Sequence, residues 1–240
     1  MMTLGEEDGV ATLTLDDGRA NAIGRAFLAE LNEKLDEIER SPAHALVVFG
    51  RPGIYSAGLD LKELPDLPPD ELTRTAGAFV EAMRRLFLFP KPIIAAADGH
   101  AIAGGMMIYL SADVRVAVDR DDVRMGLNEA VTGIPITAGT AALCTTSIPP
   151  QHHNELILHG RLLSPRETFE RGITDELVSD AADLERASIA RAKALADVDP
   201  EAYHLNKRIL REPAWESAVA RSALLRADAS TRNLFESIRR

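Results

Sequence analysis

Three glycine-containing segments, each following a predicted strand, combine residue types that could support chemistry at a carbonyl group. They read YSAGLDLK at residues 55–62, DGHAIAGGMM at residues 98–107 and GLNE at residues 126–129. Small residues in the first two segments allow another group to approach the backbone closely. Two strand-to-helix loops can each aim one backbone N–H at a single oxygen, while Glu129 stands beside them as a base. In combination, the segments indicate a site that abstracts a proton next to a carbonyl.

Each segment taken alone also has a purely structural explanation. Paired glycines at the start of a helix can simply permit close packing of the helix on a strand, and a Ser-Ala-Gly stretch can be a plain turn. A single glutamate on a loop is usually a solvated charge. The combination of the three segments, rather than any one of them, favours a functional site.

Several other chemistries lack their motifs in this chain. It contains no G-x-S-x-G elbow, no P-loop and no G-x-G-x-x-G fingerprint. The histidines lack the paired spacing of metal ligands, and the adjacent His152 and His153 would point in different directions on a helix. Cys144 lies among small residues and is predicted to be a buried apolar side chain rather than a nucleophile. We therefore expect no metal site.

The composition predicts a soluble globular protein with an acidic surface. The 240 residues are 46% hydrophobic and 27% charged, and the formal net charge is −10. This composition excludes a disordered chain, and the charge makes nucleic acid and anionic membranes poor partners. No apolar run approaches the roughly 20 residues that span a bilayer, and the first ten residues lack a signal-peptide pattern. The single cysteine excludes an internal disulfide, which is typical of the cytoplasm, where we expect this protein.

Strands and helices are predicted to alternate along one continuous core. Apolar patterning predicts strands at residues 10–15, 46–49, 92–97 and 114–118. Helical spacing or caps predict helices over residues 27–38 and 70–89, after Ser164, after Asp199, and from Pro213 to the end. This order argues for an α/β protein with mostly parallel strand pairing.

Four motifs in order give the whole chain a resemblance to the crotonase, or enoyl-CoA hydratase/isomerase, superfamily. They are RANAI at residues 19–23, YSAGLDLK at 55–62, GHAIAGG at 99–105 and GLNE at 126–129. The resemblance implies a spiral of repeated ββα units over residues 1–190, which holds an acyl-CoA site. It also implies a C-terminal helical region over residues 191–240 that packs into homotrimers or dimers of trimers.

The same resemblance assigns roles to individual positions. The backbone N–H groups of Leu59 and Gly104 would form an oxyanion hole, and Glu129 would be the catalytic residue. Coenzyme A is then part of the substrate, and no separate cofactor is expected. The residues implied for CoA binding are Arg19, Ala22, Ala57, Lys62 and Lys207, and those implied for the acyl pocket are Leu64, Met107, Ile134 and Pro135.

The reaction depends on how many carboxylates serve the site. Hydratases of this superfamily use two glutamates, but Met107 stands where the first should lie, and a thioether cannot act as a base. Isomerisation of a 3-enoyl-CoA to the trans-2-enoyl-CoA needs only one carboxylate to move a proton from C2 to C4. The mitochondrial type of 3,2-trans-enoyl-CoA isomerase is similar here, with a GLNE segment and a single catalytic glutamate. The sequence therefore favours a Δ3,Δ2-enoyl-CoA isomerase, in which burial should raise the pKa of Glu129.

Three alternatives stay open from the sequence. They are an enoyl-CoA hydratase that uses Glu129 alone, a non-catalytic acyl-CoA-binding homologue, and another thioester chemistry such as hydrolysis, decarboxylation or dehalogenation. Residues 132–139 also depart from the proline-glycine-glycine pattern that is common in hydratases. The shape of the acyl pocket, and with it the acyl-chain length, is therefore not fixed by the resemblance.

Overall fold

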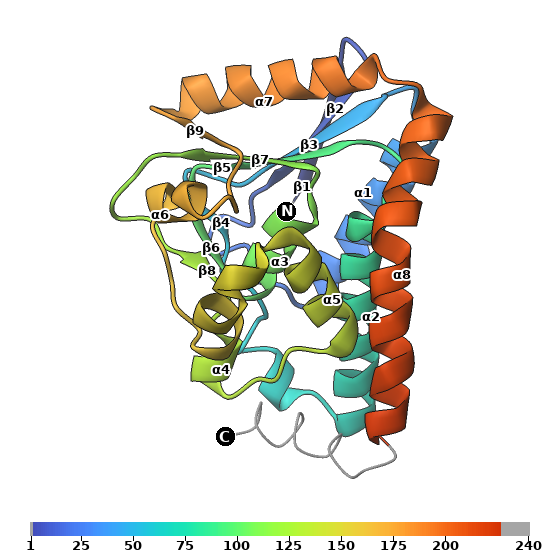
Figure 1. Cartoon of the computed structure of the whole chain (residues 1–240), viewed down its shortest axis with the longest axis vertical. Coiled ribbons are helices and arrows are strands. Elements are labelled where there is room, and N and C mark those ends of the chain that lie inside the picture. The colour runs from blue at the N-terminus through green and yellow to red at the C-terminus, as the bar shows by residue number, and fades with distance from the viewer. Residues whose placement is uncertain (1, 227–240) are drawn as a thin grey trace.

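The computed structural model describes residues 2–226, which form one large sheet, one small sheet and the helices around them (Figure 1). The large sheet has the strand order β1-β2-β3-β5-β7-β9. Strands β1 and β2 pair antiparallel, and every other pair in this sheet is parallel. Its strands are β1 (Met2–Glu7), β2 (Val10–Leu15), β3 (Ala45–Phe49), β5 (Ile93–Ala97), β7 (Val114–Val118) and β9 (Glu176–Val178).

The small sheet contains three short parallel strands, β4 (Gly53–Ser56), β6 (Gly99–Ile102) and β8 (Met125–Gly126). Each turn of the chain adds one strand to the large sheet, one to the small sheet and then a helix, as in β3-β4-α2, β5-β6-α3 and β7-β8-α4. This arrangement confirms the predicted α/β fold and its spiral of ββα units. The helices are α1 (Arg25–Arg40), α2 (Pro69–Phe87), α3 (Gly104–Ser111), α4 (Glu129–Thr132), α5 (Ala138–Ser147), α6 (Pro165–Glu170), α7 (Ala181–Ala196) and α8 (Pro200–Arg226). Three single-turn helices lie at Leu64–Asp66, Pro150–His152 and Asn154–Leu158.

The four predicted strands of the large sheet are confirmed, and the strand predicted before the GLNE segment corresponds to β8, whereas the residue patterns predicted neither β4 nor β6. The segment after β5 does not run directly into a helix, because β6 lies between Asp98 and α3. The chain is helical from Pro213 to Arg226, as predicted, but α8 passes through Pro213 without a break, so no separate helix begins there. The capping box that begins α6 is present, with Ser164 and Glu167 each accepting the other's backbone N–H.

The large sheet is apolar on both faces. Side chains alternate along its strands, so that Val47 and Ile94 face α7 while Leu46 and Ala95 face the opposite core under α1 and α2. Figure 1 shows α7 lying across the first of these faces. Burial on both faces explains why the central strands β3 and β5 have continuous apolar sequences.

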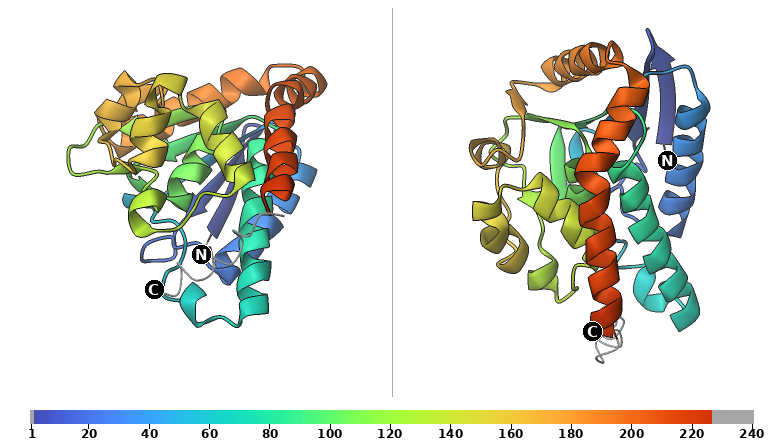
Figure 2. Two further views of the ribbon diagram at one scale, coloured as in Figure 1. Left: turned by 60° about the horizontal axis from the view of Figure 1, so that its bottom comes forward. Right: turned by 45° about the vertical axis from the view of Figure 1, so that its right-hand side comes forward.

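The predicted division of the chain at residue 190 falls within a helix. Residue 190 lies inside α7, whose Leu184 and Ala192 belong to the core beneath the large sheet. Helix α8 then runs along the outside of the molecule over α5 (Figure 2). The predicted C-terminal helical region extends to residue 240, and its residues 227–240 lie outside the described part of the chain.

Residues 2–226 contain neither a membrane-spanning helix nor a cluster of metal-binding side chains. No helix there is long and apolar enough to cross a membrane. No group of three or more histidine, cysteine or acidic side chains there could hold a metal ion.

Candidate active site

Two backbone N–H groups are left without an acceptor at the junction of the small sheet and α3. Ile23 pairs with Leu59 in an isolated parallel bridge, in which Ile23 N donates to Gly58 O (2.8 Å) and Asp60 N donates to Ile23 O (3.1 Å). The Leu59 N–H lies between these bonds and takes no part in them. Gly104 is the first residue of α3, where a helix offers no acceptor for the N–H. Within residues 2–226, neither the Leu59 nor the Gly104 N–H donates a hydrogen bond.

The loops that carry these two N–H groups touch each other. A Cβ added at Gly58 would lie 3.0 Å from Gly104 N and 2.9 Å from Ala103 Cβ. A Cβ added at Gly105 would lie 2.2 Å from Ser56 O. Gly58 also has a φ of +86°, which favours glycine. Both glycines are therefore required for the contact between the two loops.

A buried polar network holds the first of these loops. The Asn21 side-chain amide donates to Leu15 O (2.7 Å) and Tyr55 O (3.1 Å), while Ser56 Oγ donates to Asn21 O (2.8 Å). Ser56 Oγ in turn accepts the Gly58 N–H at 3.2 Å. These bonds explain the Asn in the RANAI motif, since they connect residues 19–23 to the loop that carries the free Leu59 N–H.

Backbone strain is stored where α3 begins. Ala103 has φ 51° and ψ −122°, a conformation that costs a residue with a Cβ of order 1–3 kcal/mol. Its N–H donates to Gly126 O at 2.9 Å, which ties it to β8. Gly104 is the next residue, so the conformation of Ala103 sets the direction of the free Gly104 N–H.

Glu129 is a buried carboxylate at the first position of α4. The residue is only 6% exposed, and its Oε2 has no hydrogen-bond partner within residues 2–226. Burial raises the pKa of Glu129 to about 7, and a hydrogen bond from its own backbone opposes that shift. The sequence predicted this upward shift of the Glu129 pKa. A base with a pKa of about 7 suits proton transfer near neutral pH.

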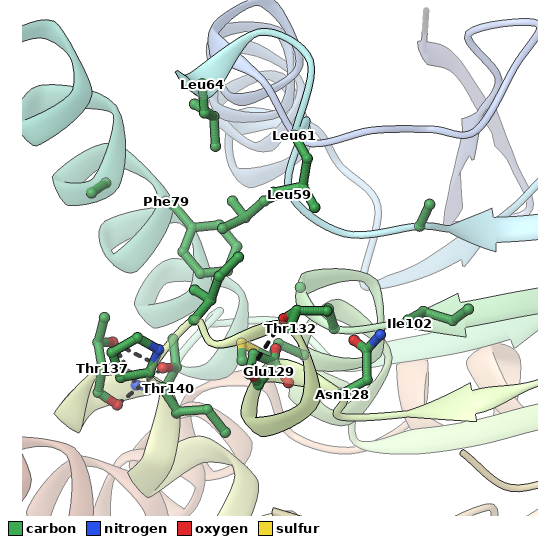
Figure 3. Close-up of a pocket in the computed structure, with 18 of the residues that line it drawn as sticks. Leu59, Leu61, Leu64, Phe79, Ile102, Asn128, Glu129, Thr132, Thr137 and Thr140 are labelled. Carbon is green, nitrogen blue, oxygen red and sulfur yellow. Dashed lines mark hydrogen bonds between the residues drawn. The ribbon is translucent and has the colours of Figure 1, made fainter. Parts of the chain in front are cut away.

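The unpaired N–H groups and Glu129 border one apolar cavity of about 120 Å³ (Figure 3). Among the described residues that line it, Glu129 is the only ionisable side chain. The structure brings together these predicted site residues: Ala57, Leu59, Leu64, Gly104, Met107, Glu129, Ile134 and Pro135. Further apolar walls that were not predicted come from Leu61, Leu72, Phe79 and Ile102.

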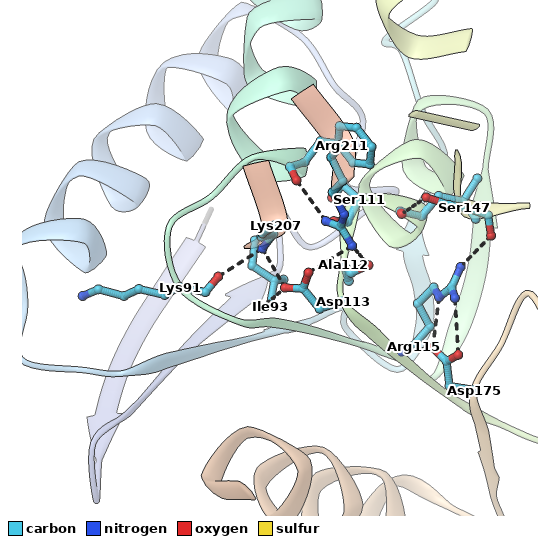
Figure 4. A network of polar contacts seen from close by, with 12 residues as sticks. Lys91, Ile93, Ser111, Ala112, Asp113, Arg115, Ser147, Asp175, Lys207 and Arg211 are labelled. Atoms are coloured by element: carbon cyan, nitrogen blue, oxygen red, sulfur yellow. Dashed lines mark hydrogen bonds and ion pairs between the residues drawn. The ribbon is translucent and has the colours of Figure 1, made fainter. Parts of the chain in front are cut away.

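Four residues predicted to bind CoA do not line this cavity. Arg19 and Lys62 are exposed and Ala22 is half-buried, so they can contact only a ligand that extends beyond the cavity. Lys207 also lies away from this cavity. Its side chain is 3% exposed, and its Nζ pairs with Asp113 Oδ2 at 2.7 Å, so this lysine is not free on the surface to meet a phosphate (Figure 4).

Asn128 is a cavity residue whose role the sequence did not reveal. It occupies the N-cap of α4, yet its side chain makes no capping hydrogen bond, although capping is what asparagine usually does there. Its Oδ1 is buried and has no partner within residues 2–226. In the sequence, only its position beside Glu129 in the GLNE motif suggested that Asn128 could belong to the site. That position does not tell whether the amide caps the helix or faces the cavity.

This geometry agrees with a comparison of the chain with protein-family models. The model described as enoyl-CoA hydratase/isomerase matches residues 5–236. The chain belongs to this family. Curated relatives of this enoyl-CoA hydratase/isomerase include a probable enoyl-CoA hydratase of Bacillus subtilis, 35% identical over 198 residues that cover 81% of this chain and 74% of the relative. The human mitochondrial enoyl-CoA hydratase domain-containing protein 2 is 32% identical over 206 residues, which cover 82% of this chain and 68% of the human protein.

Solved structures of the family superpose on most of this chain. An enoyl-CoA hydratase/isomerase family protein of Pseudomonas syringae has a TM-score of 0.86 and 30% identity, over 94% of this chain and 96% of the other. Human mitochondrial Δ3-Δ2-enoyl-CoA isomerase has a TM-score of 0.88 over 99% of this chain and 95% of the other. At 24% identity, the second likeness is one of fold alone.

Proposed function

We propose that this member of the family is a Δ3,Δ2-enoyl-CoA isomerase with Glu129 as its only proton carrier. The observation that carries the proposal is the single ionisable side chain among the described residues of the cavity wall. Met107, which is 3% exposed and lines the same cavity, stands where a hydratase would hold the first of its two glutamates. An apolar side chain there keeps water away from the reacting carbons.

The reaction then needs one proton and one oxyanion hole. The Glu129 carboxylate removes a proton from C2 of the 3-enoyl thioester, the C3=C4 electrons become part of a dienolate, and negative charge develops on the thioester oxygen. The N–H groups of Leu59 and Gly104 donate to that oxygen. The protonated Glu129 returns its proton to C4 as the double bond forms between C2 and C3, so the carboxylate is regenerated. One donor of such a hole contributes roughly 3–4 kcal/mol.

Enoyl-CoA hydratase is the second candidate, and Asn128 is the observation that favours it. Hydration needs a water molecule held beside the base, and Asn128 Oδ1 is an acceptor without a partner in the described chain. The curated relatives named above also carry the name hydratase or hydratase domain-containing protein. A non-catalytic acyl-CoA-binding protein would keep the cavity and the free N–H groups without turnover.

The proposal extends to the rest of the substrate and to assembly. The CoA moiety would leave the cavity past Ala57, with Ala22 beside its path and the exposed Arg19 and Lys62 available to its phosphates. We propose a homotrimer or a dimer of trimers. Exposed apolar side chains on α8 support association, with Leu205 48%, Ile209 70% and Leu210 76% exposed.

The test is turnover of 3-hexenoyl-CoA and of trans-2-hexenoyl-CoA by the purified protein and by Glu129→Gln. The isomerase proposal predicts that the first thioester is converted to the conjugated 2-enoyl product and that the variant loses this activity. Hydration of the second thioester without turnover of the first would replace the isomerase with a hydratase. Binding of both thioesters without turnover would indicate the acyl-CoA-binding protein.

A further inference from the structure

One side of α8 carries three docking residues at helical spacing, Lys207, Arg211 and Trp215. They follow one another at intervals of four, so they share one face of the helix. As whole residues, Lys207 is 5% exposed and Trp215 is 4% exposed, whereas Ile209 on the other side of the helix is 70% exposed. The face that carries these three residues is therefore the one that α8 buries against the core.

The first two docking residues are held by Asp113, which lies just before β7 (Figure 4). Lys207 Nζ pairs with Asp113 Oδ2 at 2.7 Å, and Arg211 Nη2 pairs with Asp113 Oδ1 at 3.0 Å. Arg211 also donates to the backbone oxygens of Phe87 (2.9 Å) and Ser111 (3.1 Å). Both carboxylate oxygens are thus used, and α8 is fixed on the ends of α2 and α3 with little freedom to slide.

The third docking residue lies directly behind the acyl cavity. A Cβ added at Gly139 would lie 2.5 Å from Trp215 Cζ2 and 2.8 Å from Cη2, so the indole already rests on the first turn of α5. The same turn lines the cavity with Thr137 and Thr140, which Figure 3 shows side by side at the cavity wall. The first turn of α5 is therefore held between the acyl cavity and the indole of Trp215.

We propose that Trp215 determines the acyl-chain length that the enzyme accepts, by holding the first turn of α5 against the acyl cavity. This inference rests on the proposed function only in requiring that the cavity binds the acyl group of a CoA thioester. The cavity measures about 120 Å³. An apolar cavity of about 150 Å³ holds one benzene molecule, so the space here suits an acyl group of about six carbons. A longer chain would have to displace the α5 turn, and the indole blocks that movement.

Trp215 is a positioning residue in this scheme, because it acts through Gly139 and does not line the cavity itself. Its ring is supported in turn by Phe87, with ring centroids 6.3 Å apart. Replacing the indole by a methyl group would leave a void into which the α5 turn can retreat. Replacing it by a phenyl ring would keep most of the support.

The experiment compares dissociation constants of hexanoyl-CoA and dodecanoyl-CoA, measured by titration calorimetry on the wild type, Trp215→Ala and Trp215→Phe. Saturated thioesters report binding without turnover, so the result does not depend on which reaction the enzyme catalyses. We expect the wild type to bind hexanoyl-CoA at least tenfold more tightly than dodecanoyl-CoA, which corresponds to about 1.4 kcal/mol. Trp215→Ala should reduce this ratio to below about threefold by improving dodecanoyl-CoA binding, and Trp215→Phe should keep it. Phe169→Ala, which removes an exposed aromatic ring on α6, is the matched control and should also keep it.

Two results would overturn the proposal. One is a wild type that binds both thioesters equally well, because the cavity would then not select length. The other is a Trp215→Ala protein that weakens both thioesters by the same factor, which a purely structural role predicts. If Trp215→Ala does not fold, Trp215→Leu replaces it, because the smaller side chain also withdraws support from Gly139 and should also reduce the ratio. Loss of isomerase turnover with length selection intact would instead reject only the proposed reaction.

Discussion

The buried Glu129 carboxylate makes the proposed reaction dependent on pH. Its pKa of about 7 results from burial, and only its deprotonated form can take the proton from C2. We expect kcat/KM for 3-hexenoyl-CoA to fall about tenfold for each pH unit below that value and to level off above it. A pH–rate profile that stays flat down to pH 5 would contradict the assignment of this pKa to the base.

The same burial predicts that Glu129 lowers the stability of the fold above neutral pH. The unfolded carboxyl titrates near its model value of 4.5, below the folded value of about 7, so the unfolded state loses its proton first as pH rises. Stability contributed by the protonated form is therefore lost between about pH 4.5 and 7, and the full cost of order 3 kcal/mol applies above that range. Glu129→Gln should be more stable than the wild type in urea at pH 8, by up to this amount, and about equal to it at pH 4. Equal stability of the two proteins at pH 8 would show that the carboxylate is well solvated.

A substitution of the single side chain Asn128 can distinguish between the two candidate reactions. If its amide holds a water beside Glu129, Asn128→Leu should lower hydration of trans-2-hexenoyl-CoA by at least tenfold and leave isomerisation of 3-hexenoyl-CoA within about threefold. A leucine has a similar size but no acceptor, so the cavity should keep its shape. An equal loss of both activities would mean that Asn128 only shapes the cavity.

At the scale of elements, the function depends on the contact between the 57–59 loop and the start of α3. Gly105→Ala would place a Cβ 2.2 Å from Ser56 O and 2.7 Å from Ser56 C, so one of the two backbones must move. Moving one N–H out of the oxyanion hole should lower kcat by about 10²–10³-fold. Gly77→Ala is the matched control, because a Cβ at Gly77 in α2 meets no atom within 4 Å. That variant should keep full activity and gain about 0.5–1 kcal/mol of stability, and a comparable loss of activity in both variants would contradict this explanation.

Elements differ in how far their sequences predict them. Continuous apolar runs identified β3 and β5, which are buried on both faces, and alternating apolar residues identified β2 and β7. Strand β8 has only two residues and β6 begins with glycine, and neither length nor composition distinguishes such segments from loops. The small sheet forms because the spiral brings these segments side by side, which is a property of the tertiary fold. Its segments were singled out from their residue types, and the resemblance to the family then assigned a role to each position.

Long-range pairing limits prediction at the scale of the whole molecule. Lys207 looked like a surface lysine free to bind a phosphate, but its partner Asp113 lies 94 residues away in the sequence. A helical pattern predicts which residues share a face, and it does not predict which neighbour meets that face. The position of Trp215 behind α5 was hidden for the same reason. Residues of the family motifs, such as Gly104 in GHAIAGG and Glu129 in GLNE, were easier to place because the family fold fixes how the motifs meet.

At the scale of the whole molecule, the proposed oligomeric state can also be tested. The proposal makes it depend on α8. Its inner side is already used to dock on the core, so the exposed Ile209 and its neighbours on α8 have no partner within residues 2–226. Each such side chain would gain about 1.5–3 kcal/mol if fully buried against another subunit, which favours association. The proposal therefore predicts a trimeric or hexameric mass for the wild type in light scattering at micromolar concentration, and a shift toward the monomer for Ile209→Glu. Val131→Glu is the control, because Val131 on α4 is also 70% exposed, so a general effect of a new charge would appear in both variants. A monomeric wild type, or dissociation by both variants alike, would remove α8 as the proposed interface.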